Sequence, residues 1–188
     1  GVDELGEIAI NNLTLTSGVL AEIAGNININ DLISTADVAS VTMTGASNTF
    51  ANEISFNAAT EVVLGDAAGE NTFAFNGGLT LAGGAASVGA TITSTGDAIN
   101  FAGSEVTLLS DSSIDTTLAD GNPNGADVSF ADLLTDAGNT FDLAIDAGSA
   151  GVISLEEVTI AELTITDAAS VTATADLTLN DFKTDMKP

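Results

Sequence analysis

Apolar and polar residues alternate along most of the chain, in short segments separated by Gly, Asp, Asn and Ser. Residues 25–30 are a clear example, because Ile27 and Ile29 occupy one set of alternate positions and asparagines occupy the other. A period of two residues is typical of a β-strand with one buried face. No segment keeps a helical period over the roughly 10 to 12 residues that define a helix with confidence. The pattern therefore predicts an all-β protein built from short strands.

Two short motifs recur and indicate a sequence repeat. The triplet Asn-Thr-Phe ends at Phe50, Phe73 and Phe141, and its spacings are 23 and 68 residues, the second close to three times the first. A second motif, an apolar residue followed by a polar residue and Phe, recurs at Ile54–Phe56, Ile99–Phe101 and Val128–Phe130. These spacings predict a degenerate repeat of roughly 20 to 25 residues, in the range of stacked solenoid coils.

Stacked coils would give each short strand a partner for its apolar face. Successive coils about 4.8 Å apart pair their backbones into parallel sheets, and inward apolar side chains form columns in a narrow core. We therefore predict a parallel β-helix (β-solenoid) of about seven to nine coils. One antiparallel β-sandwich, or several, is the alternative, because short strands with frequent turns suit that fold too. Residues 1–180 are expected to form a single solenoid domain or a segment of a longer repeat array, and residues 181–188 a boundary or linker.

Residues 92–141 contain the clearest copies of the repeat. We expect them to form about two coils, with residues 118–127 as a loop outside the coil. The expected core residues of these coils are Ile99, Phe101, Val106, Leu108, Val128 and Phe130.

The charge balance limits the partners of this protein. The chain contains 27 Asp and Glu residues but only 2 Lys and Arg residues in total, which gives a net charge of −25. Such a surface repels nucleic acid phosphates and anionic lipid headgroups, and no apolar run approaches the roughly 18 residues of a membrane span. We therefore exclude nucleic acid and membrane insertion. Copies of the chain also repel one another over a Debye length of about 8 to 10 Å, so lateral assembly is expected to need salt or divalent cations.

The residue types that are absent argue against catalysis. The sequence contains no Cys, His, Trp or Tyr, which removes thiol chemistry, imidazole bases, Cys/His zinc sites and disulfides. Paired carboxylates can hydrolyse glycosides. Polysaccharide-cleaving enzymes of this shape, however, are expected to use Arg or Lys and aromatic sugar platforms. This chain has only two Lys, both near its C-terminus, and no Trp or Tyr. We expect no enzymatic activity and no organic cofactor.

The loop LADGNPNGAD, at residues 118–127, is the best candidate for a binding site. Its oxygen-bearing side chains surround Gly121 and Gly125, which allow the backbone to fold tightly. Oxygen ligands at such spacing suit calcium, although the loop lacks the terminal Glu of an EF-hand. The same residue types are also typical of any exposed turn, so both interpretations stay open. The candidate calcium ligands are Asp120, Asn122, Asn124 and Asp127.

Three stretches carry a resemblance to a known family: INFAGSEVTLLSDSSIDTT, NTFDLAIDAGSAGVISL and LTITDAASVTATADLTL. They resemble the degenerate β-strand repeats of very large secreted bacterial surface proteins, similar to filamentous haemagglutinin-like adhesins, over about residues 52–179. The resemblance implies a right-handed parallel β-helix in an adhesin, stalk, matrix or cell-envelope component. The scarcity of Lys and Arg departs from many such adhesins.

These observations together predict a structural repeat module of an extracellular bacterial surface protein. It would form a rod in a stalk, sheath, surface layer or self-assembling filament, and its partners would be further copies or neighbouring repeats of a longer chain. The alternative is an adhesin segment that binds a glycan or a cell surface. The expected location is secreted, at the bacterial cell surface or in the extracellular matrix.

Overall fold

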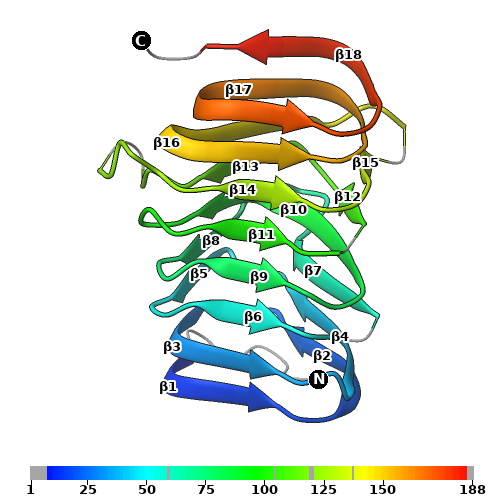
Figure 1. Ribbon diagram of the computed structural model, residues 1–188. Coiled ribbons are helices and arrows are strands. Elements are labelled where there is room, and N and C mark those ends of the chain that lie inside the picture. Colours follow the sequence, from blue (N-terminus) through cyan, green and yellow to red (C-terminus); the bar gives the residue numbers. More distant parts are fainter. Residues whose placement is uncertain (1–7, 59, 104, 119–120, 137, 186–188) are drawn as a thin grey trace.

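The computed structural model describes residues 8–185, except 59, 104, 119, 120 and 137. Within these residues the chain forms strands and no helix, and the strands stack in parallel as a β-solenoid of about 8 coils. In Figure 1 the chain climbs from the N-terminal to the C-terminal end, with the front strands running to the right and the rear strands returning, so the coil is right-handed. The predicted fold class is confirmed, and the alternative sandwich is excluded.

The strands are short in the middle of the stack and merge into longer, bent strands toward its ends. Gly, Asp and Asn separate most of them, as the punctuation of the sequence predicts. The bounds of the strands are β1 Ile8–Leu15, β2 Gly18–Ile23, β3 Ile27–Ser34, β4 Val38–Met43, β5 Ser47–Phe50, β6 Ile54–Phe56, β7 Glu61–Gly65, β8 Asn71–Phe75, β9 Leu79–Leu81, β10 Ala85–Thr93, β11 Ile99–Phe101, β12 Val106–Leu108, β13 Ser112–Asp115, β14 Val128–Phe130, β15 Leu134–Asp136, β16 Asp142–Leu155, β17 Val158–Ala173 and β18 Leu177–Thr184.

Three strand segments make up each coil, so the stack has three faces. Face A contains β5, β8 and β13, face B contains β6, β9, β11 and β14, and face C contains β2, β4, β7, β12 and β15. The longer strands bend around a corner and contribute to two faces or more. Strands β1, β3 and β16 serve faces A and B, β10 serves faces C and A, β17 serves all three, and β18 serves faces C and A.

The motif of an apolar residue, a polar residue and Phe marks face B, as its recurrence predicts. Phe56, Leu81, Phe101, Phe130 and Leu155 lie in register on successive coils and are all buried. The rings of Phe101 and Phe130 stack with centroids 4.7 Å apart. The core residues predicted for the two central coils are likewise all buried. The core is therefore a set of side-chain columns parallel to the axis.

The triplet Asn-Thr-Phe does not mark equivalent positions. Phe50 pairs with Phe75, and Phe73 pairs with Asn48, so the second triplet is shifted by two residues relative to the first. A shift of two keeps both phenylalanines directed inward, because the side-chain period of a strand is two. The even spacing in the sequence was therefore misleading, since coil length varies from 18 residues between Ile153 and Val171 to 31 residues between Ile114 and Ile145.

The stacked strands extend past the predicted boundary at residue 181. Residues 181–184 form the end of β18 and pair in parallel with Glu162, Leu163, Thr164 and Ile165. This part of the predicted linker is therefore the last described strand of face A. Residues 186–188 lie outside the described residues.

Candidate functional site

The predicted loop projects from the corner between faces A and B, between β13 and β14 (Figure 1). Thr116 closes its base, because the Thr116 hydroxyl accepts a hydrogen bond from Ala126 N at 2.9 Å and donates one to Ala126 O at 3.0 Å. Thr116 itself is fully buried. The sequence therefore correctly predicted a segment that leaves the coil, and a single buried hydroxyl fixes where the segment returns.

The loop packs on the next coil through its backbone. Ser149 N donates to Pro123 O at 3.0 Å, and Ala150 N donates to Asn124 O at 2.9 Å. Gly125 has a φ of 59°, and a Cβ placed there would lie 2.0 Å from Ala147 O. The close approach of the two chain segments therefore requires glycine at this position.

The predicted calcium ligands are distributed between two neighbouring coils. The Asn122 amide nitrogen donates to Thr95 O at 3.1 Å, in the preceding coil, whereas Asp127 Oδ1 accepts from Val152 N at 2.8 Å, in the following coil. Asn124 is exposed, and Asp120 lies outside the described residues. Among the residues that the structure describes, no three His, Cys, Asp or Glu side chains form a group that could hold a metal ion. Asn122 and Asp127 thus hold the loop to the two neighbouring coils. Calcium binding stays a prediction that depends on Asp120.

A buried carboxylate, which the sequence patterns did not single out, lies on face C. Asp136 pairs with the core residue Leu108 and is only 5% exposed. Its Oδ1 accepts from Gly138 N at 2.8 Å, and its Oδ2 accepts from Thr140 N and Phe141 N, each at 2.8 Å. Burial by itself raises the pKa of Asp136, but the backbone N–H donors outweigh burial and lower the pKa below its ordinary value. The backbone at the corner after β15 therefore turns around the ionised side chain of Asp136.

Replacing Asp136 with asparagine should lower the free energy of unfolding at neutral pH by about 1 to 3 kcal/mol, because the amide cannot accept all three hydrogen bonds. The stabilisation by Asp136 is present above the unfolded-state pKa of about 3.9 and is lost as the pH falls through the lower folded-state pKa. Denaturant unfolding at pH 7 and near pH 3 measures the difference in unfolding free energy between wild type and Asp136→Asn. This difference should be smaller near pH 3. An equal difference at both pH values would contradict the role of the Asp136 charge.

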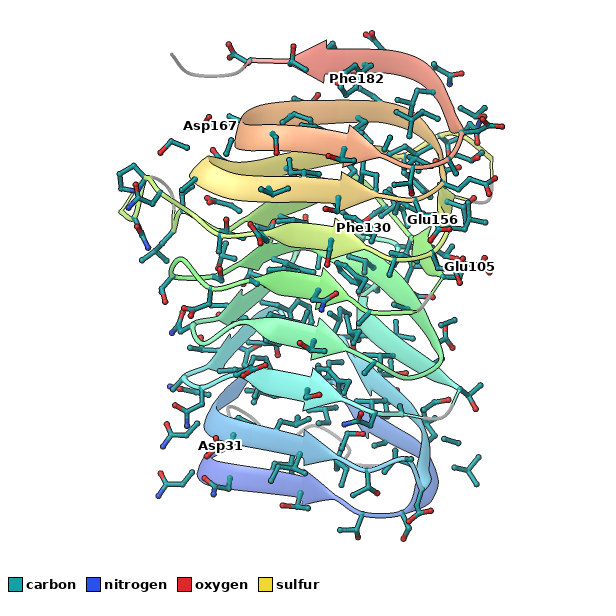
Figure 2. The ribbon with its side chains drawn as sticks, viewed as in Figure 1. Asp31, Glu105, Phe130, Glu156, Asp167 and Phe182 are labelled. Carbon is teal, nitrogen blue, oxygen red and sulfur yellow. The ribbon has the colours of Figure 1, made fainter. Side chains whose placement is uncertain are left out.

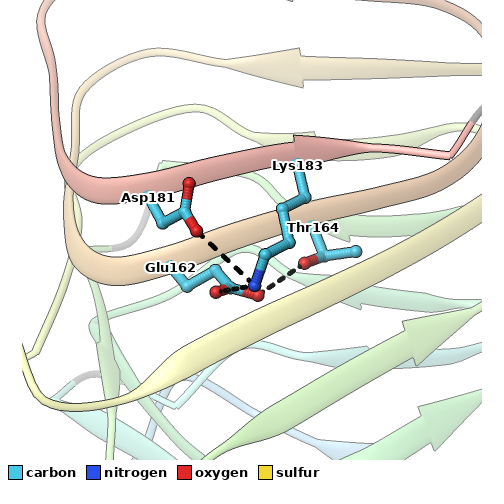
Figure 3. A network of polar contacts seen from close by, with 4 residues as sticks. All are labelled: Glu162, Thr164, Asp181 and Lys183. Carbon is cyan, nitrogen blue, oxygen red and sulfur yellow. Dashed lines mark hydrogen bonds and ion pairs between the residues drawn. The ribbon is translucent and has the colours of Figure 1, made fainter.

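Lys183, the one cationic side chain among the described residues, lies on the last coil beside a column of carboxylates (Figure 3). Asp142, Glu162 and Asp181 are in register on successive strands of face A. Lys183 Nζ contacts Glu162 Oε2 and lies 3.5 Å from Asp181 Oδ2, while the Thr164 hydroxyl donates to Glu162 Oε1 at 2.9 Å. Figure 3 shows that Glu162 receives both contacts, so Lys183 joins the last strand to the strand beneath it.

The pKa directions in this column follow from its composition. Hydrogen bonds from Lys183 and then from Thr164 lower the pKa of Glu162, and the same contact with Glu162 raises the pKa of Lys183. Desolvation raises the pKa of Asp142, and the charges of Asp111 and Glu162 raise it further. Among the described residues, Lys183 therefore compensates only part of the negative charge of this carboxylate column.

The outward positions of face A are uncharged over several coils. In the described part of the chain, hydroxyl, amide and methyl groups follow one another on β3, β5, β8, β10 and β13 until Asp115. Ser113 Oγ donates to Thr91 Oγ1 at 3.2 Å, so neighbouring hydroxyls bond along the axis. A shallow depression lies where Asn26, Asn28, Ser47 and Thr49 meet. Carboxylates such as Asp31, Glu105 and Glu156, by contrast, project from other parts of the outer surface (Figure 2). The outward side chains of this uncharged part of face A are Asn28, Ser47, Thr49, Thr72, Ala74, Thr91, Thr93 and Ser113.

No family model, curated protein or solved structure matches this chain. The fold places it among parallel β-solenoid proteins. Among the described residues, no helix is long and apolar enough to cross a membrane.

Proposed function

We propose that this chain is a structural module of an extracellular bacterial surface protein, which forms a rod in a stalk, sheath, surface layer or self-assembling filament. The observation that carries the proposal is the exposure of apolar side chains at the two ends of the stack. Among the described residues, every exposed large apolar side chain except Leu118 belongs to the first two coils or the last one. Leu177 and Phe182 lie in the last coil, in register with the buried residues Val158 and Leu163, so they continue the core into the end of the stack. Val19, Leu20 and Ile33 lie in the first two coils, where Leu20 and Ile33 point outward from the side of the rod.

A stack of parallel coils promotes association at its ends. The terminal strands carry backbone N–H and C=O groups that can pair with another strand, and the core columns of the rod continue into the end faces. Phe182 lies in the last strand, above the closed part of the core (Figure 2). Association at the ends would bury these groups and lengthen the rod.

The other features support an assembling, non-catalytic role. The sequence resemblance to repeats of filamentous haemagglutinin-like adhesins favours a secreted bacterial surface protein. The sequence contains no His, Cys, Trp or Tyr, which supports a role without catalysis. The proposed module acts through packing and hydrogen bonding and uses no organic cofactor. Its partners are further copies of the chain or neighbouring repeats.

Assembly of the purified protein should depend on salt, because each copy carries a net charge of −25. Negative-stain images should show separate particles in low salt, and filaments or sheets in high salt or with calcium. Magnesium serves as a control that separates general screening from a calcium-specific effect. A protein that stays monomeric under all of these conditions would contradict the proposal.

An adhesin segment is the second candidate, and the uncharged part of the outer surface of face A, from β3 to Ser113 of β13, favours it. A ladder of hydroxyl and amide groups can exchange hydrogen bonds with a neutral glycan, whereas the acidic parts of the rod would repel anionic sugars. Saturable binding of a neutral glycan by a protein that stays monomeric would support this candidate in place of the first.

A further inference from the structure

We infer that copies of this chain stack head to tail, each rotated by one face relative to the copy beneath it, and that Lys183 of one copy pairs with Glu22 of the next. The inference rests on the proposed function, because it specifies the contact through which the rods would lengthen. It follows from the shape of the two end faces and from the position of their charges.

The C-terminal end face consists of three strand segments at three heights. In chain order they are residues 170–173 on face B, 177–179 on face C and 181–184 on face A. Among the described residues, none of the three pairs with a further strand on its outer side. Phe182 is in register with the buried Leu163, and Leu177 with the buried Val158, yet these two side chains are 48% and 41% exposed. The last coil therefore directs core side chains into an open end.

The N-terminal end face has the same construction. Its segments are residues 8–10 on face A, 12–15 on face B and 18–23 on face C. Leu13 and Ala21 are in register with the buried residues Leu32 and Val41 of the following coil, but are themselves only partly buried. Among the described residues, nothing packs on the outer side of these core columns at the N-terminal end.

The spiral path of the chain determines how the two faces fit. Each segment lies about a third of a coil above the preceding one, so both ends have the form of a step. The described chain begins and ends on face A. If face A of the next copy lay on face A, the strands would meet there only, and faces B and C would be separated by about two strand spacings, roughly 10 Å.

Rotation of the next copy by one face removes these gaps. Residues 8–10 then lie on residues 170–173, 12–15 on 177–179, and 18–23 on 181–184, each at about one strand spacing of 4.8 Å. All three sheets continue from one copy into the next. The contact between copies repeats the contact between coils that already forms the core of the molecule.

The side chains that meet in this arrangement are complementary. Leu13 and Leu15 continue the column of Leu177 and Leu179 on the inner side. Phe182 faces Ala21, so that a large side chain lies against a small one.

In the rotated arrangement, two opposite charges of neighbouring copies also lie next to each other. Lys183, directed outward between Phe182 and Thr184, faces Glu22, directed outward between Ala21 and Ile23. Glu22 is the one carboxylate among residues 8–23, and Lys183 is the one described cation. Without the rotation, Lys183 would face the position of Ala9. The match of the two charges therefore favours the rotated arrangement over direct stacking.

A charge exchange tests the pairing in the full chain. Glu22→Lys and Lys183→Glu should each raise the protein concentration needed for filament formation about tenfold or more, because each places like charges in contact. Lys183→Glu also breaks the ion pair with Glu162 within its own copy, so the double variant is compared with Lys183→Glu alone. Adding Glu22→Lys to Lys183→Glu should lower the required concentration about threefold or more, because the exchanged charges attract each other. Glu105→Lys is a matched control, since it makes the same charge change as Glu22→Lys on an exposed residue of a middle coil. A double variant that assembles no better than Lys183→Glu alone would overturn the pairing.

Cysteine pairs test the rotation, because the chain has no cysteine of its own. Thr14, Thr172 and Thr178 are all exposed. A mixture of Thr14→Cys and Thr178→Cys proteins should give disulfide-linked dimers on oxidation, since the two positions would face each other on adjacent strands. A mixture of Thr14→Cys and Thr172→Cys proteins reports stacking without rotation, with a bismaleimide to span the wider gap. Preferential linkage of this second pair within filaments would overturn the inference while the proposed function stands. Absence of any assembly by the wild-type protein would overturn the proposed function as well.

Discussion

Replacing Phe101 with alanine is expected to lower the free energy of unfolding by about 3 to 5 kcal/mol, the range of large-to-small changes in a packed core. Phe101 is fully buried, and its ring stacks on Phe130 with centroids 4.7 Å apart. On its other side it is in register with Leu81. In a stack of single coils the neighbours above and below supply most of the contacts of a core side chain. The cavity would therefore weaken two coil interfaces at once.

Urea unfolding, followed by circular dichroism in low salt where copies repel one another, measures this loss. Phe182→Ala is the matched control, because it makes the same chemical change in the last coil, where the side chain is 48% exposed. We expect the control to lose less than half as much free energy as Phe101→Ala. Equal losses would contradict the continuous core described for the central coils.

Replacing Gly65 with alanine is the second change with a large expected effect, a loss of about 2 to 5 kcal/mol of unfolding free energy, of which about 1 to 3 comes from overpacking and about 1 to 2 from the left-handed backbone. Gly65 ends β7 with a φ of 86°, and a Cβ placed there would lie 2.1 Å from Gly89 O in the next coil. Backbone cannot move away as a flexible side chain can. Alanine would therefore force the two coils apart at this corner.

Gly103 provides a control for the backbone conformation alone. Its φ is 93°, close to that of Gly65, but a Cβ placed there would have no atom within 4 Å. Gly103→Ala should cost only the left-handed strain of about 1 to 2 kcal/mol. The difference in unfolding free energy between the two variants then measures the cost of a Cβ at the close approach of neighbouring coils. If Gly103→Ala proves as harmful as Gly65→Ala, coil-to-coil contact does not explain the requirement for glycine at position 65.

The architecture could be predicted from the sequence because a β-solenoid repeats one local pattern. Alternation with a period of two placed Ile99, Phe101, Val128 and Phe130 in the core, and the structure buries all four. Register was harder to predict. A shift of two residues leaves the inward and outward pattern unchanged, so nothing in the triplets ending at Phe50 and Phe73 distinguishes the true pairing of Phe50 with Phe75. Variable loops at the corners also change the length of each coil.

The candidate site was predictable in its position but not in its contacts. Gly, Asn and Pro marked residues 118–127 as a loop, and residue type alone suggested oxygen ligands. The partners of Asn122 and Asp127 belong to two other coils, and they follow only from the stacking. Asp136 was missed for a similar reason, since a carboxylate in an inward position becomes acceptable only when several backbone N–H groups turn toward it. The Asp, Gly, Asn and Thr residues around this corner were the available signal.

Electron cryomicroscopy of the protein in high salt tests the central claim, that the solenoid lengthens by stacking its coils end to end. We expect unbranched filaments with strands perpendicular to the filament axis and an axial repeat of about 4.8 Å that runs through the junctions between copies. At each junction the map should show Lys183 of one copy beside Glu22 of the next. Filaments with strands parallel to the axis, or particles that remain single solenoids at every salt concentration, would contradict this claim.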